Sequence, residues 1–83
     1  MILNIEWSEE ARADVRRLDK PTARRVFDTL LRFARTGEGD IKQLKGSLAG
    51  KLRLRSGDYR LIISQSNDTL RIHSVRHRRE AYR

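Results

Sequence analysis

The chain has 83 residues, no cysteine, 36% charged residues and a formal net charge of +8 at pH 7. This length suits one small domain, taken as residues 1–83, and the lack of cysteine excludes both a disulfide framework and a thiolate metal site. No apolar run approaches the roughly 20 residues that span a bilayer, and the first residues lack the basic leader of a signal peptide, so we expect a cytoplasmic protein.

A short strand and a helix are expected first. Residues 2–5 are rich in Ile and Leu and suggest a strand that ends at Trp7, whose ring is expected to pack in the core. Ser8 suits the N-cap of a helix, because its hydroxyl can accept a backbone N–H and the two glutamates that follow favour the positive end of the helix dipole. The next apolar residues repeat at spacings of four and three, which predicts a helix over about residues 9–18.

A second helix is expected over about residues 21–35. Pro21 is poorly tolerated inside a helix but suits the first turn of a new one. The apolar residues that keep the helical period, and are therefore expected to be buried, are Ala23, Val26, Phe27, Leu30, Leu31 and Ala34. Gly37 and Gly39 follow, and glycine commonly ends a helix. The two helices are expected to lie antiparallel.

Three strands are expected in the second half of the chain, over about residues 50–56, 58–65 and 69–77. A connector precedes them, in which Lys42, Lys45 and Gly46 are expected to form a loop. Residues with turn preferences separate the strands. The order of elements predicts an α+β fold: a small antiparallel β-sheet with an N-terminal strand and an antiparallel helix pair packed on one face.

Basic and apolar residues alternate strictly in the first of these strands. Leu52 and Leu54 are expected to enter the core. Lys51, Arg53 and Arg55 would then line up on the opposite face. Residues 50–83 carry nine Lys or Arg against three Asp or Glu, a bias that favours a polyanionic partner over a plain solvated face, although the solvated face is the alternative interpretation.

The open face of the sheet is expected to hold a phosphate backbone. Arg60, and Arg71 and His73 from the following strand, would extend the basic set. Cations around one phosphate stabilise the charge that develops when it is attacked. His77 is also a candidate for proton transfer, because imidazole titrates near neutral pH. Acidic residues are scarce in this half, whereas a two-metal hydrolase needs several carboxylates, so we predict neither a metal nor a cofactor.

Two motifs, residues 51–63 and 75–83, resemble the RelE/ParE superfamily of toxins from type II toxin-antitoxin modules, on its RelE side. The resemblance extends over essentially the whole chain, including residues 7–11 and both expected helices. RelE-type members cleave mRNA in the ribosomal A site without a metal, by attack of the ribose 2′-hydroxyl on the adjacent phosphate. The resemblance therefore implies a toxin that inhibits translation as a metal-independent, ribosome-dependent mRNA endoribonuclease.

The resemblance also implies the roles of individual residues. The catalytic set would be Lys51, Arg53, Arg60, Arg78 and Tyr82. Arg60 and Arg78 would clamp the scissile phosphate. Lys51 would protonate the leaving 5′-oxygen, and Tyr82 would stack on a base or help to deprotonate the 2′-hydroxyl. Further contacts with RNA are expected from Arg55, Arg71, His77 and Arg79. Arg53 departs from the RelE pattern, which has a second lysine there, and arginine does not readily give up its proton.

Two other functions stay open from the sequence. A ParE-like toxin would inhibit DNA gyrase by protein contact, without nuclease chemistry, on the same scaffold. A degenerate member would only co-repress its operon together with an antitoxin. The expected partners are a cognate antitoxin, mRNA and the ribosome, and no membrane. The toxin and antitoxin would form a hetero-oligomer that binds operator DNA through the antitoxin.

Overall fold

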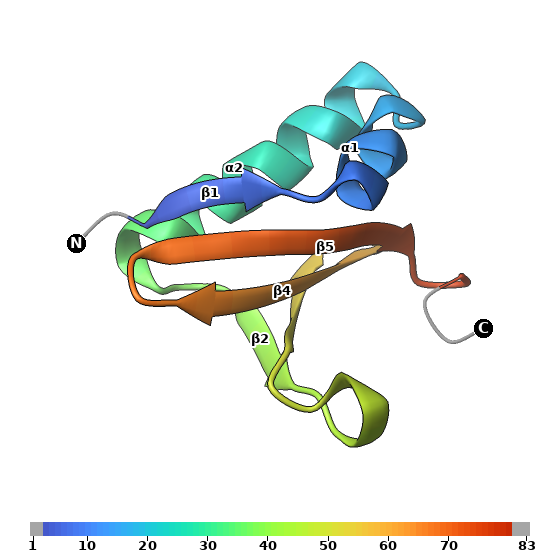
Figure 1. Cartoon of the computed structure of the whole chain (residues 1–83). Helices are drawn as coiled ribbons and strands as arrows, with labels where there is room; N and C mark the ends of the chain where they lie inside the picture. The colour runs from blue at the N-terminus through green and yellow to red at the C-terminus, as the bar shows by residue number, and fades with distance from the viewer. Residues whose placement is uncertain (1–2, 81–83) are drawn as a thin grey trace.

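The computed structural model of the chain describes residues 3–80. Within these residues a five-stranded sheet carries two helices on one face (Figure 1). The elements in chain order are β1 (Asn4–Trp7), α1 (Glu9–Arg16), α2 (Lys20–Thr36), β2 (Asp40–Gln43), the 3₁₀ helix η1 (Gly46–Leu48), β3 (Leu52–Ser56), β4 (Tyr59–Ser66) and β5 (Thr69–His77). The expected α+β fold, with its helices packed on one face, is confirmed. None of the helices in residues 3–80 is long and apolar enough to cross a lipid bilayer.

The sheet has the strand order β1-β5-β4-β3-β2. The pairs formed by β2, β3, β4 and β5 are antiparallel, whereas β1 joins the edge of β5 in parallel. The sheet is therefore mixed, a difference from the antiparallel sheet expected from the sequence. A parallel pair requires a long crossover, and here everything from α1 to β4 lies between the two strands in the chain.

The connector before β3 contains a strand that the sequence did not predict. Lys42 lies in β2 rather than in a loop, while Gly46 begins η1. Strand β2 is only four residues long, and Ile41 is its one half-buried residue, so alternation gives almost no signal there. Pairing with β3 holds this segment in the extended conformation, with Asp40 opposite Arg55 and Ile41 opposite Leu54.

The ends of the helices follow the expected local chemistry. Ser8 caps α1, and its Oγ accepts a hydrogen bond from the backbone N–H of Ala11 at 3.0 Å. Helix α1 ends at Arg16, earlier than expected, because the N–H groups of Arg17 and Leu18 turn to carbonyls three residues back. Pro21 lies in the first turn of α2, as expected.

The buried stripe of α2 differs from the one predicted. Val26, Leu30 and Ala34 are buried as expected, but Phe33 joins them, whereas 42% of Phe27 and 48% of Leu31 is exposed. The helix packs on the sheet through one stripe of its surface, and Phe27 and Leu31 lie outside that stripe. Phe27 instead packs edge-on against Trp7, with ring centroids 5.5 Å apart.

Gly37 ends α2 in the left-handed conformation, with φ of 76°. Replacing Gly37 by Ala is expected to lower the free energy of unfolding by about 1–2 kcal/mol, because an L side chain is strained there. No atom lies within 4 Å of the added Cβ, so the cost is conformational. Urea denaturation measures it, and Gly37→Asn should recover part of the loss because Asn tolerates this conformation. Equal stability of wild type and Gly37→Ala would contradict the prediction.

Candidate functional site

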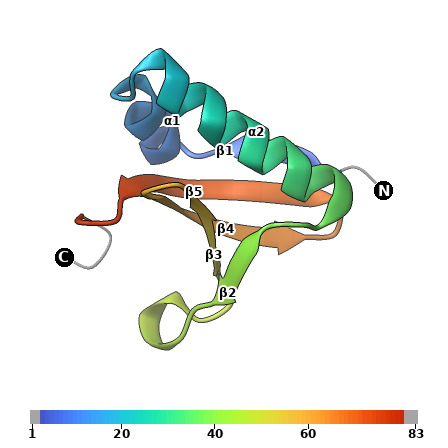
Figure 2. The same ribbon diagram turned by 180° about the vertical axis from the view of Figure 1, so that it is seen from behind.

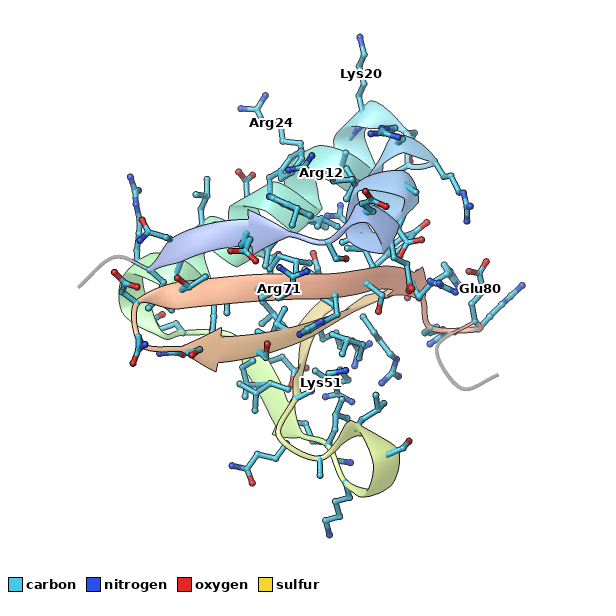
Figure 3. The ribbon with its side chains drawn as sticks, viewed as in Figure 1. Arg12, Lys20, Arg24, Lys51, Arg71 and Glu80 are labelled. Atoms are coloured by element: carbon cyan, nitrogen blue, oxygen red, sulfur yellow. The ribbon has the colours of Figure 1, made fainter. Side chains whose placement is uncertain are left out.

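The face of the sheet opposite the helices carries an open hollow of about 450 Å³. Its lining includes the cations of Lys51, Arg60 and Arg76, the imidazole of His73 and the carboxylates of Glu10 and Glu80. Figure 2 shows from behind that both helices lie on one side of the sheet. In Figure 3, Lys20 and Arg24 project from the helices, whereas Lys51 lies on the other side of β5. The hollow is therefore a basic site on the uncovered face.

Strand alternation brings Lys51 and Arg60 to this face. Leu54 and Leu61 are paired across β3 and β4 and are fully buried against the helices. The residues that alternate with them in the two strands must therefore point the other way. Residue 51, directly before β3, and residue 60, in β4, both line the hollow. The expectation that Lys51 and Arg60 share one face of the sheet is confirmed.

A β-bulge in β5 changes the alternation. Ile62 pairs with Ser74 and Ile63 pairs with Ile72, so the register passes over His73. Ile72 and Val75 are three residues apart, yet both are buried, which regular alternation does not allow. The extra residue lets His73 and Ser74 both line the hollow.

Two hydrogen bonds fix His73 in the bulge. Its Nε2 lies 2.7 Å from Ser64 Oγ on β4, and its carbonyl oxygen accepts a hydrogen bond from Ser8 Oγ at 2.8 Å. Burial lowers the pKa of His73 below its ordinary value of 6.5, and the positive charges of Lys51 and Arg71 lower it further. The imidazole is therefore mainly neutral at pH 7.

Beyond the end of β1, Ser8 and helix α1 form the hydrogen bonds to the edge of β5. The backbone N–H of Ser8 donates to the carbonyl of Ile72 at 3.0 Å. Further along, the buried Asp14 carboxylate accepts the backbone N–H of Val75 at 2.9 Å and Arg76 Nε at 3.2 Å. Arg76 also donates to Glu10 at 2.8 Å. Hydrogen bonding to Asp14 raises the pKa of Arg76 above its ordinary value. Arg76 thus ties β5 to α1, a role that the sequence did not predict.

Three of the predicted basic residues are engaged by other groups. Arg53 forms an ion pair with Asp40 at 3.5 Å, and only 17% of its side chain is exposed. Its Nε is buried and has no hydrogen-bond partner among residues 3–80. Arg55 Nε donates to the carbonyl of Gly57 at 3.0 Å, and Arg71 forms an ion pair with Glu6 of β1. Among the described residues that line the hollow, none of these three arginines is found.

Three of the residues predicted near the C-terminus, His77, Arg78 and Arg79, do not line the hollow. His77 packs edge-on against Tyr59 with ring centroids 5.3 Å apart, and its Nδ1 accepts the backbone N–H of Arg79 at 3.2 Å. The backbone N–H of Arg78 donates to the carbonyl of Asp58 at 2.7 Å, and the side chain of Arg78 is exposed. Tyr82 lies outside the described residues. No group of three His, Asp or Glu side chains within residues 3–80 is arranged to hold a metal ion.

The fold is shared with chains of several solved toxin-antitoxin complexes. A chain of the RelBE2 complex from Mycobacterium tuberculosis is 25% identical, with a TM-score of 0.83 over 93% of this chain and 99% of that chain. A chain of the heterotetrameric YoeB-YefM complex from Staphylococcus aureus is 25% identical, with a TM-score of 0.76 over 93% of this chain and 98% of that one. A chain of the RelE-RelB complex from Pyrococcus horikoshii is 22% identical, with a TM-score of 0.78 over 98% of this chain and 100% of that chain. At this identity the likeness shows the fold alone.

The sequence itself matches a family model. No curated protein matches the chain significantly. The model described as the ParE toxin of type II toxin-antitoxin systems, parDE, matches residues 5–82, which include all of the first motif and all but the last residue of the second. This range includes both helices, the basic strand and the hollow. The chain therefore belongs to the ParE toxin family of type II toxin-antitoxin systems, within the RelE/ParE superfamily.

Proposed function

We propose that this toxin cleaves mRNA on the ribosome without a metal ion and thereby inhibits translation in the cytoplasm. The observation that carries the proposal is the hollow that both Lys51 and Arg60 line. Fixed cations around a phosphate stabilise the charge that accumulates on its oxygens during attack. An interface that inhibits by contact alone does not require such a cationic hollow.

The proposed reaction is an internal transfer at phosphorus. The ribose 2′-oxygen loses its proton and bonds to the adjacent phosphorus, and the bond from phosphorus to the 5′-oxygen breaks. The products are a 2′,3′-cyclic phosphate and a 5′-hydroxyl. Arg60 contacts the non-bridging oxygens, with Arg78 and Tyr82 completing the set that the RelE resemblance implies, and Lys51 supplies the proton to the 5′-oxygen. Arg53, paired with Asp40, contributes positive potential rather than proton transfer.

Primer extension on a defined mRNA in a reconstituted translation reaction tests the function. The protein is added to complete reactions and to the same mRNA without ribosomes. Cleavage inside codons that requires ribosomes is expected. Cleavage of free RNA to the same extent would contradict the ribosome-dependent proposal, and lack of cleavage in both reactions would contradict nuclease activity itself.

Inhibition of DNA gyrase is the second candidate, and the match to the ParE toxin family favours it. In that case the protein would leave mRNA intact in the translation reaction. It would instead inhibit supercoiling of relaxed plasmid by purified gyrase. The two assays, run on one preparation, separate the candidates.

We also propose a cognate antitoxin as the partner, because the RelBE2 and YoeB-YefM structures are toxin-antitoxin complexes. Its acidic and apolar residues would cover the basic face, and the resulting hetero-oligomer would bind operator DNA through the antitoxin.

The affinity of the antitoxin is expected to depend on salt. The toxin has a net charge of +8, and the screening length falls from about 10 Å at about 0.1 M salt to about 3 Å at about 1 M. We therefore expect the dissociation constant to rise by about tenfold or more across this range. Calorimetric titration measures it, with sucrose at matched osmolality as the control. An unchanged dissociation constant would contradict an electrostatic interface.

A further inference from the structure

We propose that His73 is the general base that removes the proton from the ribose 2′-hydroxyl. This inference rests on the proposed RNA cleavage. The predicted catalytic residues include no side chain whose ordinary pKa suits removal of the 2′-hydroxyl proton near neutral pH. An arginine does not readily give up its proton, and Arg53 is paired with Asp40. A phenol, the group that Tyr82 would offer, is ordinarily a weak acid with a pKa of about 10. Imidazole is the side chain best suited to accept a proton near neutral pH.

His73 lines the hollow, and the bulge places Ser74 beside it on the same face. In a regular strand only one of two consecutive residues faces a given side, but here His73 and Ser74 both line the hollow, with Lys51 and Arg60. Bulges commonly re-aim side chains beside active sites. The same feature keeps Ile72 and Val75 in the core, so the position of His73 does not disturb packing.

The surroundings of His73 orient its ring. Ser64 on β4 holds Nε2 at 2.7 Å, and Ser8, at the start of α1, holds the carbonyl. We assign the Nε2 proton to the bond with Ser64 Oγ, which leaves the Nδ1 lone pair to accept a proton. Ser64 is thus a positioning residue, because it acts through the imidazole.

The charges around His73 favour the neutral ring that a base requires. Lys51, before β3, and Arg71, on β5 itself, oppose protonation, whereas Glu10 of α1 favours it. Burial opposes protonation more strongly than any of these charges, so the pKa lies below 6.5. The other charged groups that line the same hollow are Arg60, Arg76 and Glu80.

The proton balance closes within the hollow. His73 takes the 2′-hydroxyl proton and becomes imidazolium, while the ammonium of Lys51 gives a proton to the 5′-oxygen as its bond to phosphorus breaks. The imidazolium then returns its proton to solvent, and Lys51 regains one from solvent. No other reactant is consumed.

Two carboxylates in the hollow are the competing bases. Glu10 accepts a hydrogen bond from Arg76 at 2.8 Å, which engages it in the link between α1 and β5. Glu80 follows β5 at the C-terminal end of the hollow and is labelled in Figure 3. Glu80→Gln is therefore the informative comparison with His73→Gln, since each substitution removes a proton acceptor but keeps the approximate size of the side chain.

The test is single-turnover cleavage of ribosome-bound mRNA. His73→Gln retains an amide that can bond to Ser64, so the fold should persist, but we expect cleavage to fall by about 10²- to 10⁴-fold. The wild-type rate should rise as pH increases through the lowered pKa of His73 and should be level above it, because the neutral ring is the active form. His73→Gln should lose this rise. Added imidazole should restore part of the activity of His73→Ala.

Further variants separate a chemical role from a structural one. The exposed Gln65→Ala in the same sheet is the control that should cleave like wild type. Should His73→Gln unfold on thermal melting, Ser64→Ala replaces it, and a reduced rate with a displaced pH profile is expected. Wild-type cleavage by His73→Gln, or loss of cleavage in Glu80→Gln alone, would overturn the assignment and leave the proposed function standing. A wild-type protein that cleaves no RNA would overturn both.

Discussion

Arg60→Ala is expected to reduce RNA cleavage by about 10²- to 10³-fold, because it removes a fixed cation from the hollow where phosphate charge develops. The loss should appear in kcat, since the charge to be stabilised is greatest in the transition state. Arg60→Lys should cleave at an intermediate rate, because lysine keeps the charge but lacks the planar fork of arginine. Single-turnover cleavage on ribosomes measures both variants, and circular dichroism checks their folds.

Arg24→Ala is the matched control for overall charge. It also lowers the net charge of +8 by one, but Arg24 is exposed on α2 (Figure 3). Equal losses in Arg24→Ala and Arg60→Ala would mean that bulk charge, rather than the hollow, governs cleavage. In cells, Arg60→Ala, Arg78→Ala and Tyr82→Phe should each abolish toxicity. Toxicity that persists in all three would exclude the nuclease proposal.

Asp14→Ala is expected to lower the free energy of unfolding by about 3–5 kcal/mol, the largest stability effect that we expect of a single substitution here. Only 4% of Asp14 is exposed, and its carboxylate accepts hydrogen bonds from Val75 and Arg76. The substitution leaves the backbone N–H of Val75 and the Nε of Arg76 without their acceptor. A domain of this size has a total stability of about 4–12 kcal/mol, so the loss is a large part of the total.

Urea denaturation of Asp14→Ala and Asp14→Asn tests this link between α1 and β5. Asn keeps an acceptor oxygen but loses the charge, so its loss should be the smaller of the two. Asp28→Ala is the control, because Asp28 is an exposed carboxylate on α2 and its loss should change stability by less than about 0.5 kcal/mol. A loss below about 1 kcal/mol in Asp14→Ala would contradict the role given to the carboxylate.

The strands and their faces were predictable because alternation is a local signal. Leu54 and Leu61 are buried as expected, and Lys51 and Arg60 line the opposite face. His73 faces the open side of the sheet as expected, but the alternation of β5 breaks after it, because the bulge places Ser74 on the same side. The bulge depends on how β5 pairs with β4, and no local residue pattern marks it. The prediction of which α2 residues are buried was partly wrong for a related reason. The spacing of apolar residues shows which side of a helix is apolar, but not how much of that side neighbouring elements cover.

The partners of the charged residues were not predictable either. Arg53 pairs with Asp40 across two strands, and Arg71 pairs with Glu6, which is 65 positions away in the chain. Arg53, predicted to be catalytic, and Arg71, predicted to contact RNA, form these pairs and do not line the hollow. The roles of Arg78, Arg79 and Tyr82 stay predictions.

The sequence by itself determined the α+β class, the superfamily and the basic face, because periodicity, caps and motifs are properties of neighbouring residues. Only the tertiary structure decided which cations share a hollow, that β1 runs parallel to β5, and that a bulge places Ser74 in the site beside His73. These features arise from strand pairing and from contacts between residues far apart in the chain. They exist only when the sheet and α1 assemble, since α1 supplies the groups that satisfy the bulged half of β5.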